Sequence, residues 1–387
     1  MIKVLTVFGT RPEAIKMAPL VREFAKYADD GQFDARVCVT GQHRQMLDQV
    51  MEIFGIKPDY DLDIMKEGQD LFDITTAVLN GMKPVLDEFK PDIVLVHGDT
   101  GTSTAAALAA FYRQVDVGHV EAGLRTYNRY SPWPEEMNRQ LTGRLANLHF
   151  SPTQMAAQNL KNEKVDPETI FITGNTVIDA LHIAVGQLNQ GGEMTEALKS
   201  KLQSMIADID AICEKGQFIL VTGHRRENFG HGFLEICRAI KEVALEFPSW
   251  NIIYPVHLNP NVQKPVKELL SNIPNVHLIQ PLEYLPFVYL MSRCSFVVSD
   301  SGGIQEEAPG LGKPVLVMRD TTERPEALEA GTVRLVGTDS NLIIDSCRAL
   351  IEDRELYKSM ATAKNPFGDG KAAKRIVEII KTRYSKQ

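Results

Sequence analysis

Three carboxylates in the first half of the chain stand where side chains could carry out acid–base chemistry. Asp99 ends the apolar run DIVLVHGD, Glu121 ends VDVGHVEAG, and Glu135 follows the proline-stiffened loop YSPWP. Ligands of parallel sheets bind beyond the carboxyl ends of the strands. A carboxylate at the end of a buried strand is unfavourable unless it is paired or solvated in a cleft. The three residues are therefore candidate general acids and bases.

Each carboxylate also has a purely structural explanation. Asp99 could cap the helix that begins at TSTAAALAA. Glu121 could form a salt bridge with Arg125. Glu135 could pair with Arg139, which lies four residues further along a predicted helix. Each explanation is adequate alone, but three such carboxylates in one half of the chain favour a shared site.

The stretch FGTRPEAIK combines a predicted strand end with a helix start. Thr10 and Glu13 have capping-box spacing, and Pro12 falls in the first turn, where its missing N–H does no harm. These roles leave Arg11 and Lys16 unexplained. Two cations near a helix N-terminus oppose the helix dipole unless an anion lies there, which makes both residues candidate ligand contacts.

In the second half, VVSDSGGIQEE places small residues directly after an apolar strand. Ser301, Gly302 and Gly303 would expose successive backbone N–H groups at a helix N-terminus, where a phosphate can bind. Glu307, one turn into the helix, could accept hydrogen bonds from a ribose diol. A tight strand-to-helix turn needs glycine in any case, so the motif alone is weak.

The segment VTGHRRENFG follows the first apolar run of the second half. His224 could cap a helix or satisfy the backbone, or it could bind an anion or transfer a proton. Arg225 and Arg226 could be surface charges. We therefore treat only His224 as a candidate site residue in this segment.

These residues need elements that bring them together, and the pattern of apolar runs predicts such elements. Runs rich in Val and Ile alternate with helical patterns from the N-terminus, and the alternation restarts near residue 217. This pattern is typical of parallel sheets covered on both faces, so we predict an α/β fold with two doubly wound, Rossmann-like domains. We place the domains at 1–172 and 173–365, with a terminal helix at 366–387 returning to the first, and we expect a loose connector at 186–200.

Composition excludes several functional classes. The 387 residues carry a formal charge of −8, which argues against nucleic-acid binding. No apolar stretch is long enough for a membrane span, and no leader pattern is evident, so we expect a cytoplasmic protein. The five cysteines form no CxxC pair, and we expect reduced, structural thiols. No G-x-G-x-x-G, Walker loop or metal-ligand spacing occurs, so we expect no NAD, metal or other cofactor.

A set of motifs in one order resembles a known family. FGTRPEAIKMAPL, VHGDT, GHVEAGLRT, SPWPEEMNRQLTG, TGNTVIDAL, HRRENFG, YPVHLNP, SDSGGIQEEAP and NPFGDG are similar to segments of the bacterial non-hydrolysing UDP-N-acetylglucosamine 2-epimerases. The resemblance runs almost end to end. It implies a glycosyltransferase-B-like pair of Rossmann-like domains facing a cleft, a homodimer, and interconversion of UDP-GlcNAc and UDP-ManNAc for cell-surface polysaccharides.

The resemblance also implies roles for particular residues. The catalytic set is Asp99, Glu121, Glu135 and His224. The groups that hold the diphosphate, sugar and ribose are Arg11, Lys16, Arg139, Ser301, Gly302, Gly303 and Glu307. Which carboxylate acts as base and which as acid stays open.

Some family members are regulated by UDP-GlcNAc bound beside the active site. The matching residues here are Gln42, Gln45, Glu136 and His257. Related proteins carry an arginine in the segment that reads MKEGQDL here, where this chain has Gly68. This departure affects the expected regulatory site and leaves the expected catalytic set unchanged.

The implied reaction is demanding because the hydrogen at C2 of the sugar is barely acidic. Without NAD, the C2 proton can be lost together with UDP from C1, which leaves a 2-acetamidoglucal, and re-addition from the opposite face gives the epimer. Acid and base groups on two faces of the sugar are then required. The alternatives are a hydrolysing epimerase that releases ManNAc and UDP, a glycosyltransferase of the same architecture, and a non-catalytic nucleotide-sugar sensor.

Overall fold

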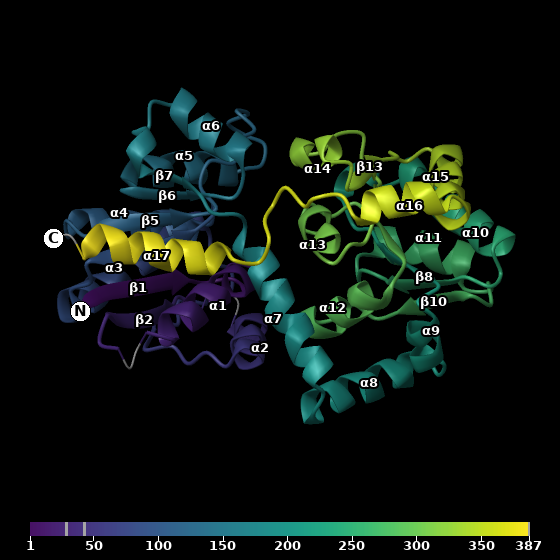
Figure 1. The fold of residues 1–387 in the computed structure, drawn as a ribbon, viewed down its shortest axis with the longest axis horizontal. Helices are drawn as coiled ribbons and strands as arrows, with labels where there is room; N and C mark the ends of the chain where they lie inside the picture. The colour runs from purple at the N-terminus through teal and green to yellow at the C-terminus, as the bar shows by residue number, and fades with distance from the viewer. Residues whose placement is uncertain (28–29, 42–43, 386–387) are drawn as a thin grey trace. The chain divides into compact units, whose positions relative to one another are not determined.

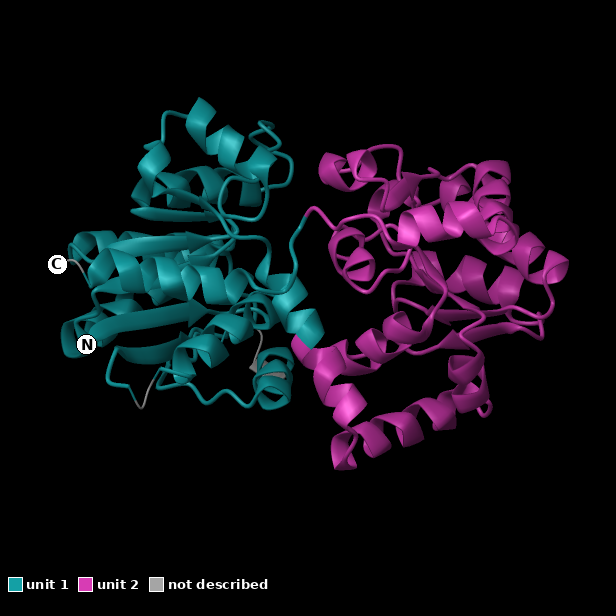
Figure 2. Ribbon diagram, in the orientation of Figure 1, with its two compact units in different colours: residues 1–182, 367–387 teal, residues 183–366 magenta. Residues whose placement is uncertain are grey.

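The computed structural model, which describes residues 1–27, 30–41 and 44–385, contains two parallel sheets in separate units (Figure 1). Unit 1 comprises residues 1–182 and 367–387, and unit 2 comprises residues 183–366 (Figure 2). Each sheet is flanked by helices. The prediction of an α/β fold with two Rossmann-like domains is therefore confirmed.

The sheet of unit 1 has seven strands in the order β3-β2-β1-β4-β5-β6-β7, and all its pairs are parallel. Every residue from Val4 to Phe8 is buried, which shows that both faces of the sheet are covered at its centre. The strands are β1 (Ile2–Phe8), β2 (Phe33–Val39), β3 (Tyr60–Asp61), β4 (Ile93–His97), β5 (Asp116–Val120), β6 (Leu148–Ser151) and β7 (Ile170–Ile172).

Two of the helices of unit 1, α3 and α4, pack their apolar side chains on one face of this sheet. The alanine-rich sequence of α4 lets it pack closely against both α3 and α5. The helices are α1 (Arg11–Ala25), α2 (Arg44–Phe54), α3 (Leu71–Phe89), α4 (Gly101–Tyr112), α5 (Glu135–Leu145), α6 (Gln154–Asn162) and α17 (Ala372–Tyr384). A further helix, α7 (Thr176–Gln190), begins in unit 1 and continues into unit 2.

The C-terminal helix α17 belongs to unit 1 and packs against α1 (Figure 1). Its start is fixed by the buried side chain of Asp179, which accepts hydrogen bonds from Ala372 N at 3.1 Å and Ala373 N at 2.9 Å. Just before the helix, the carbonyl of Phe367 accepts a hydrogen bond from Asn175 N at 2.6 Å. Both segments that join unit 1 to unit 2 are therefore anchored close to the start of α7.

Unit 2 has a six-stranded parallel sheet in the order β10-β9-β8-β11-β12-β13, with α10, α11 and α15 contributing to its core. Its strands are β8 (Phe218–Thr222), β9 (Asn251–Pro255), β10 (Val276–Ile279), β11 (Phe296–Ser299), β12 (Val315–Val317) and β13 (Val333–Leu335). Its helices are α8 (Glu193–Met205), α9 (Ile209–Lys215), α10 (His231–Glu246), α11 (Pro260–Leu270), α12 (Tyr284–Arg293), α13 (Ile304–Gly310), α14 (Pro325–Glu329), α15 (Ser340–Glu352) and α16 (Arg354–Ala361).

The expectation of a loose connector at 186–200 is wrong. The helix α7 continues to Gln190, and α8 begins at Glu193 after a two-glycine break. Leu198 and Leu202 of α8 are buried. The two glycines separate α7 from α8, and the polar residues that follow them form the exposed face of α8, which is an amphipathic helix.

The strand order reverses once in each sheet, at β1 and β4 in unit 1 and at β8 and β11 in unit 2. Such switch points hold the ligand sites of doubly wound sheets, because the helices that follow the two strands lie on opposite faces and leave their loops apart. The candidate residues after β1, β4, β8 and β11 therefore lie where the fold favours a binding site.

Candidate active site

The turn after β1 requires glycine at position 9, because a side chain there would clash with its neighbours. A Cβ added at Gly9 would lie 2.0 Å from Thr40 Oγ1. The predicted capping box is present: the side chain of Thr10 accepts from Glu13 N, and Glu13 Oε2 accepts from Thr10 N at 2.8 Å and from Gly9 N at 3.1 Å. The buried Glu13 carboxylate thus fixes the backbone that leads into α1.

The same carboxylate joins the starts of α1 and α4. Glu13 Oε1 accepts from Thr100 Oγ1 at 2.6 Å and from Ser103 Oγ at 3.1 Å. Thr100 is the N-cap of α4, because its side chain accepts from Ser103 N. The interpretation of Asp99 as the cap is therefore wrong, and its carboxylate is available for other contacts.

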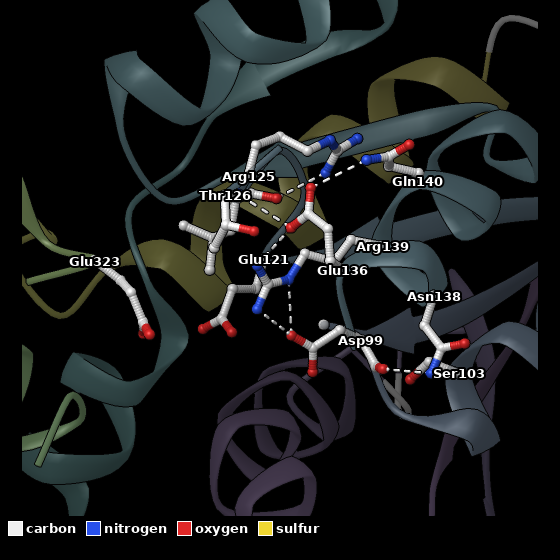
Figure 3. Close-up of polar contacts among 12 residues, drawn as sticks. Asp99, Ser103, Glu121, Arg125, Thr126, Glu136, Asn138, Arg139, Gln140 and Glu323 are labelled. Carbon is white, nitrogen blue, oxygen red and sulfur yellow. Dashed lines mark hydrogen bonds and ion pairs between the residues drawn. The ribbon is translucent and has the colours of Figure 1, made fainter. Parts of the chain in front are cut away.

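Asp99 and Arg139 form an ion pair in which two guanidinium N–H groups donate to the same carboxylate oxygen (Figure 3). Asp99 Oδ2 accepts from Arg139 Nε at 2.9 Å and from Nη2 at 2.8 Å. Arg139 Nη1 also contacts Glu136 Oε2 at 3.1 Å. The proposed Glu135–Arg139 surface pair is therefore wrong. Glu135, the first residue of α5, is half-buried and has no hydrogen bond or ion pair within the part of the chain that the structure describes.

Glu136 holds the loop that precedes α5 (Figure 3). Its fully buried carboxylate accepts from Thr126 N at 3.0 Å, Tyr127 N at 3.1 Å and Gln140 Nε2 at 3.0 Å, besides Arg139. Burial alone would raise the pKa of Glu136, but these donors lower it below its usual value. The residue has a clear structural role in addition to the regulatory role that the resemblance implies.

Glu121 lies directly after β5 in a left-handed conformation, with φ of 61°. Its Oε2 lies 2.5 Å from Lys16 Nζ, 2.8 Å from Asn175 Nδ2 and 3.6 Å from His97 Nε2. Burial would raise the pKa of Glu121, but the positive Lys16 beside it holds that pKa well below its usual range. Positive φ at a non-glycine residue marks stored backbone strain, which often accompanies function.

The contacts of Glu121 rule out its proposed salt bridge with Arg125 and explain why Lys16 lies near the start of α1. Its partner is Lys16, so the proposed salt bridge to Arg125 is wrong. Arg125 pairs with Glu163 instead, at 2.7 Å and 2.9 Å. The anion that Lys16 needs near the start of α1 is thus a protein carboxylate. Arg11 has no ion-pair partner among the residues that the structure describes.

The carboxylate of Glu121 lies against the turn that carries Asp99. An ideal Cβ on Gly98 would lie 3.7 Å from Glu121 Oε1. His119 fixes this turn, because its ring Nε2 lies 2.7 Å from the Gly98 carbonyl. Burial lowers the pKa of His119 to about 3, so the ring is neutral and Nε2 carries the donated proton. Asp99 and Glu121 are therefore brought together at neighbouring strand ends.

In unit 2, the residue that organises the turn after β8 is Asp300, which sequence reasoning missed. This fully buried side chain accepts from His224 N and Arg225 N, both at 2.8 Å, and so fixes the turn after β8. The His224 ring stacks on His257 with centroids 5.3 Å apart. Burial lowers the pKa of His224, although Asp300 opposes that shift. An aspartate that directly follows an apolar strand was the available signal.

In the predicted phosphate-binding turn, one of the three backbone N–H groups already has an acceptor in the protein. Ser301 N donates to Ser299 Oγ at 3.0 Å, whereas the N–H groups of Gly302 and Gly303 have no acceptor among the described residues. A Cβ on Gly302 would lie 3.3 Å from Arg324 Nη1, so the turn and this arginine are close. Two N–H groups and a nearby guanidinium form a setting that suits an anion.

The remaining predicted residues have less defined surroundings. Glu307 is half-buried in the first turn of α13, and its neighbour Glu306 pairs with Arg324 at 2.8 Å. Gln42 and the side chain of Gln45 lie outside the described residues. Gly68 lies in an exposed turn with φ of 74°.

Other features of the described residues concern metals, membranes and cysteines. Within residues 1–27, 30–41 and 44–385, no cluster of three metal-ligand side chains occurs. No helix in these ranges has the length and apolarity needed to cross a bilayer. All five cysteines are buried and unpaired.

The family model of UDP-N-acetylglucosamine 2-epimerase matches residues 25–381. A UDP-N-acetylglucosamine 2-epimerase of Campylobacter jejuni is 59% identical over 98% of this chain and 97% of its own length. The structure of the Neisseria meningitidis enzyme bound to UDP-GlcNAc is 54% identical, with a TM-score of 0.86 over 98% of this chain and 99% of that chain. A Listeria monocytogenes structure described as a putative UDP-N-acetylglucosamine 2-epimerase is 48% identical, with a TM-score of 0.91 over 100% and 97%.

These similarities extend over the full set of motifs and over both sheets. They confirm the resemblance to bacterial epimerases and the glycosyltransferase-B-like pair of Rossmann-like domains that it implied. From its sequence, its fold and its relatives, this chain belongs to the UDP-N-acetylglucosamine 2-epimerase family.

Proposed function

We propose that this protein interconverts UDP-GlcNAc and UDP-ManNAc by inverting C2 of the sugar, without net hydrolysis. The observation that supports this most directly is the pair of carboxylates, Asp99 and Glu121, at neighbouring strand ends, each with a cationic partner. Family membership at 59% identity to a named epimerase supports the same activity. The substrate follows from the relative whose structure contains UDP-GlcNAc.

The proposed reaction has two balanced halves. A carboxylate removes the C2 proton while the C1–O bond breaks and its electron pair leaves with UDP, so that a C1=C2 double bond forms. The products of this half are 2-acetamidoglucal and UDP. A second acidic group then protonates C2 from the opposite face while a UDP oxygen adds to C1. A proton donor and a proton acceptor on two faces of the sugar are therefore needed.

The residues of unit 1 supply the proton transfers in this proposal. Glu121 is ionised in the ligand-free protein, because Lys16 holds its pKa low, so it can accept a proton. Two N–H groups of the Arg139 guanidinium orient the Asp99 carboxylate. The Glu135 side chain has no hydrogen-bond or ion-pair partner among the described residues that would compete with a substrate. Which of the three acts as base in each direction is left to experiment.

The residues of unit 2 bind UDP in this proposal. The N–H groups of Gly302 and Gly303 and the ring of His224 would contact the diphosphate, and Glu307 would contact the ribose. Fixed donors around a diphosphate stabilise the charge that develops as UDP leaves, which lowers the barrier to C1–O cleavage. Arg11, which has no ion-pair partner in the described ranges, adds a cation for the same purpose.

The decisive experiment is incubation with UDP-GlcNAc in deuterated water, followed by NMR. Formation of UDP-ManNAc with deuterium at C2 supports the proposal. Free ManNAc with UDP selects a hydrolysing epimerase, transfer to an added acceptor selects a glycosyltransferase, and unchanged substrate selects a sensor. Inversion with complete retention of the C2 hydrogen would contradict the proton-transfer route.

Variants connect this activity to the site. Glu121→Gln and Asp99→Asn remove a proton acceptor at constant size, and each should lower kcat by about 100-fold or more, since general acid–base groups contribute roughly 10²- to 10⁴-fold. Glu352→Gln, at an exposed position at the end of α15, is the matched control and should keep full activity. Equal effects at all three positions would argue against a special role for the first two.

The expected regulation by UDP-GlcNAc is a separate part of the proposal. In this proposal, exposed His257, which stacks on His224, would contact a second nucleotide sugar, whereas the Glu136 carboxylate already has four donor groups. Initial rates from UDP-ManNAc, measured with and without small amounts of UDP-GlcNAc, test it. Strong activation supports a regulatory site, and simple competition argues against one.

The remaining proposals concern assembly and compartment. We expect a homodimer, which the exposed rings of Phe111 and Tyr112 at the end of α4 support, because exposed apolar patches often mark subunit contacts. We expect action in the cytoplasm, which is compatible with five unpaired cysteines in one chain.

A further inference from the structure

The motif TGNTVIDAL contains a buried residue that the proposed reaction does not use. Asn175 is 3% exposed and makes several hydrogen bonds around the start of α7. Its Nδ2 donates to Glu121 Oε2 at 2.8 Å, and its Oδ1 accepts from Val177 N at 3.1 Å. Its backbone N donates to the Phe367 carbonyl at 2.6 Å.

These contacts determine which way the amide of Asn175 points. A flipped amide would direct its oxygen at the Glu121 carboxylate and its NH₂ at the Val177 N–H, so that both contacts would become repulsive. The residue is also held at its backbone by Phe367. Asn175 therefore presents a fixed donor to Glu121 rather than a mobile one.

The two oxygens of Glu121 have different surroundings. Oε2 is held by Lys16 and Asn175 and lies 3.6 Å from His97 Nε2. Oε1 has no hydrogen-bond donor within the described part of the chain and lies beside the Gly98 turn. A lysine ammonium, on a flexible stem, attracts the carboxylate without fixing its plane. The planar amide of Asn175 supplies the directional contact.

We propose that Asn175 is a positioning residue for Glu121: its amide N–H fixes Oε2 and so directs Oε1, which has no donor among the described residues, toward C2 of the sugar. This inference rests on the proposed epimerase function and adds a residue to its site. The backbone contact with Phe367 and the side-chain cap on α7 then serve to keep the amide in place.

The competing explanation is that Asn175 only caps α7. Two substitutions separate the two roles. Asn175→Asp keeps an oxygen for Val177 N, because aspartate is an equally good cap. It replaces the donor to Glu121 with a second carboxylate, which raises the pKa of Glu121 by like-charge repulsion. Because this repulsion follows from proximity alone, a second substitution, Asn175→Ser, isolates the capping role. A purely capping role predicts unchanged kinetics in Asn175→Ser, whereas a positioning role predicts a large loss.

The test compares steady-state kinetics of wild type, Asn175→Asp and Asn175→Ser as a function of pH. Serine can still cap the helix but is too short to reach Glu121. We expect both variants to lose roughly 10- to 100-fold in kcat, as expected for one hydrogen bond to a charged group, with KM changed less than about threefold. Both variants should move the acidic limb of the pH profile upward, because each removes a donor to the ionised carboxylate, and Asn175→Asp should move it further, by about one unit or more.

Matched controls keep the test falsifiable. Asn147→Asp makes the same chemical change at an exposed asparagine whose Oδ1 also accepts a backbone N–H, from Val117 at 2.8 Å, and should leave kinetics unchanged. Thermal unfolding of each variant shows whether α7 is intact. Folded Asn175 variants with wild-type kcat and pH profile would overturn the proposal.

A second readout separates failure of this inference from failure of the proposed function. The Glu121 carboxyl can be titrated by NMR in protein labelled with ¹³C at the glutamate carboxyls, with Glu121→Gln as the assignment control. An upward shift of its pKa in Asn175→Asp supports the contact even if wild type lacks epimerase activity. An unchanged titration overturns the inference even if wild type is an active epimerase.

Discussion

The ionisation of Glu121 depends on one neighbour. Burial favours the protonated carboxyl, and Lys16 at 2.5 Å reverses that preference. A base for the C2 proton must be ionised before substrate binds, so the pair prepares Glu121 for the first proton transfer. The same pairing makes Glu121 a weak base in the ligand-free state. Contact of Lys16 with a substrate phosphate would weaken its hold on Glu121 and increase that basicity.

Replacing Lys16 by methionine tests this dependence. We expect Lys16→Met to destabilise the fold by roughly 2–3 kcal/mol at pH 7, because it leaves a buried carboxylate without its counter-charge. The folded-state pKa of Glu121 is depressed in wild type, so the stabilisation is present above the unfolded pKa and is lost as pH falls through the folded pKa. The difference measured by urea unfolding should therefore shrink at pH 4.

Lys16→Arg is the control for the Lys16→Met experiment. It keeps the charge and should retain most of the stability while disturbing the close contact. The acidic limb of the pH–rate profile should move upward in Lys16→Met only. An equal loss of stability at pH 7 and pH 4 in Lys16→Met would show that packing of the lysine stem, rather than its charge, is responsible.

At this scale, the sequence was a better guide to which residues to consider as site candidates than to the partners of those residues. Asp99 and Glu121 were recognisable because charged groups at strand ends need an explanation, and Arg139, in α5, was recognisable from the family resemblance. Their pairing was not, because nearby sequence suggested Arg125 for Glu121, whereas the true partner lies 105 residues away on α1. Asp300 and Asn175 were missed for a related reason: their hydrogen bonds cross from one loop to another.

The start of α1 is positioned by close packing at a glycine. Gly9→Ala would place a methyl group 2.0 Å from Thr40 Oγ1 and 2.8 Å from Thr102 Oγ1. We expect a loss of roughly 1–3 kcal/mol from overpacking. We also expect a lower kcat, because the displaced turn leads into α1, which carries Lys16. Urea unfolding and steady-state kinetics measure the two effects.

Gly186 provides the matched comparison for Gly9. It lies inside α7, and a Cβ there would meet no atom within 4 Å. Gly186→Ala should therefore stabilise the protein by roughly 0.5–1 kcal/mol, since glycine is unfavourable in a helix interior. Similar destabilisation by both substitutions would contradict the packing argument at Gly9.

The attachment of α17 depends on Asp179. Asp179→Ala leaves two buried backbone N–H groups, at Ala372 and Ala373, without their acceptor, each at a cost of roughly 1–3 kcal/mol. We expect faster amide hydrogen exchange in peptides from residues 372–384 and little change in unit 2. Asp179→Asn, which keeps one acceptor, should give an intermediate rate. Unchanged exchange in both variants would show that packing on α1 holds the helix alone.

Helices and strands were more predictable from the sequence than the segments that connect them. The alternation of apolar runs and helical patterns correctly predicted two parallel sheets, because burial on both faces leaves a strong sequence signal. Composition failed at 186–200, since glycine and polar residues suit an exposed helix face as well as a loop. The capping box at Thr10 and Glu13 was predictable because its contacts are local.

The oligomeric state can be measured on the whole molecule. We expect light scattering after size exclusion to give about twice the chain mass of 43.2 kDa. Replacing Phe111 and Tyr112 with glutamate should lower that mass toward a single chain, because like charges and lost apolar burial disfavour association. A wild-type mass of one chain would contradict the dimer. A dimer that survives the double substitution would place the contact elsewhere.

Family membership was predictable from sequence because many short motifs occur in one order. Each motif alone can be explained by its structural role, but the occurrence of all of them in one order cannot. The distinction that remains for experiment is chemical: the fate of the glucal, and hence net hydrolysis, depends on exclusion of water during the reaction rather than on any single residue type.

Unit 1 consists of two pieces, because residues 367–387 complete it after the whole of unit 2. On the ribosome, unit 2 therefore has all its residues before unit 1 does, which reverses the usual N-to-C order of domain completion during synthesis. Until the last helix emerges, the apolar surface of α1 that it covers is bare, so the nascent chain presents a binding surface for chaperones. A chain that ended before residue 367 would contain the whole of unit 2 but an incomplete unit 1.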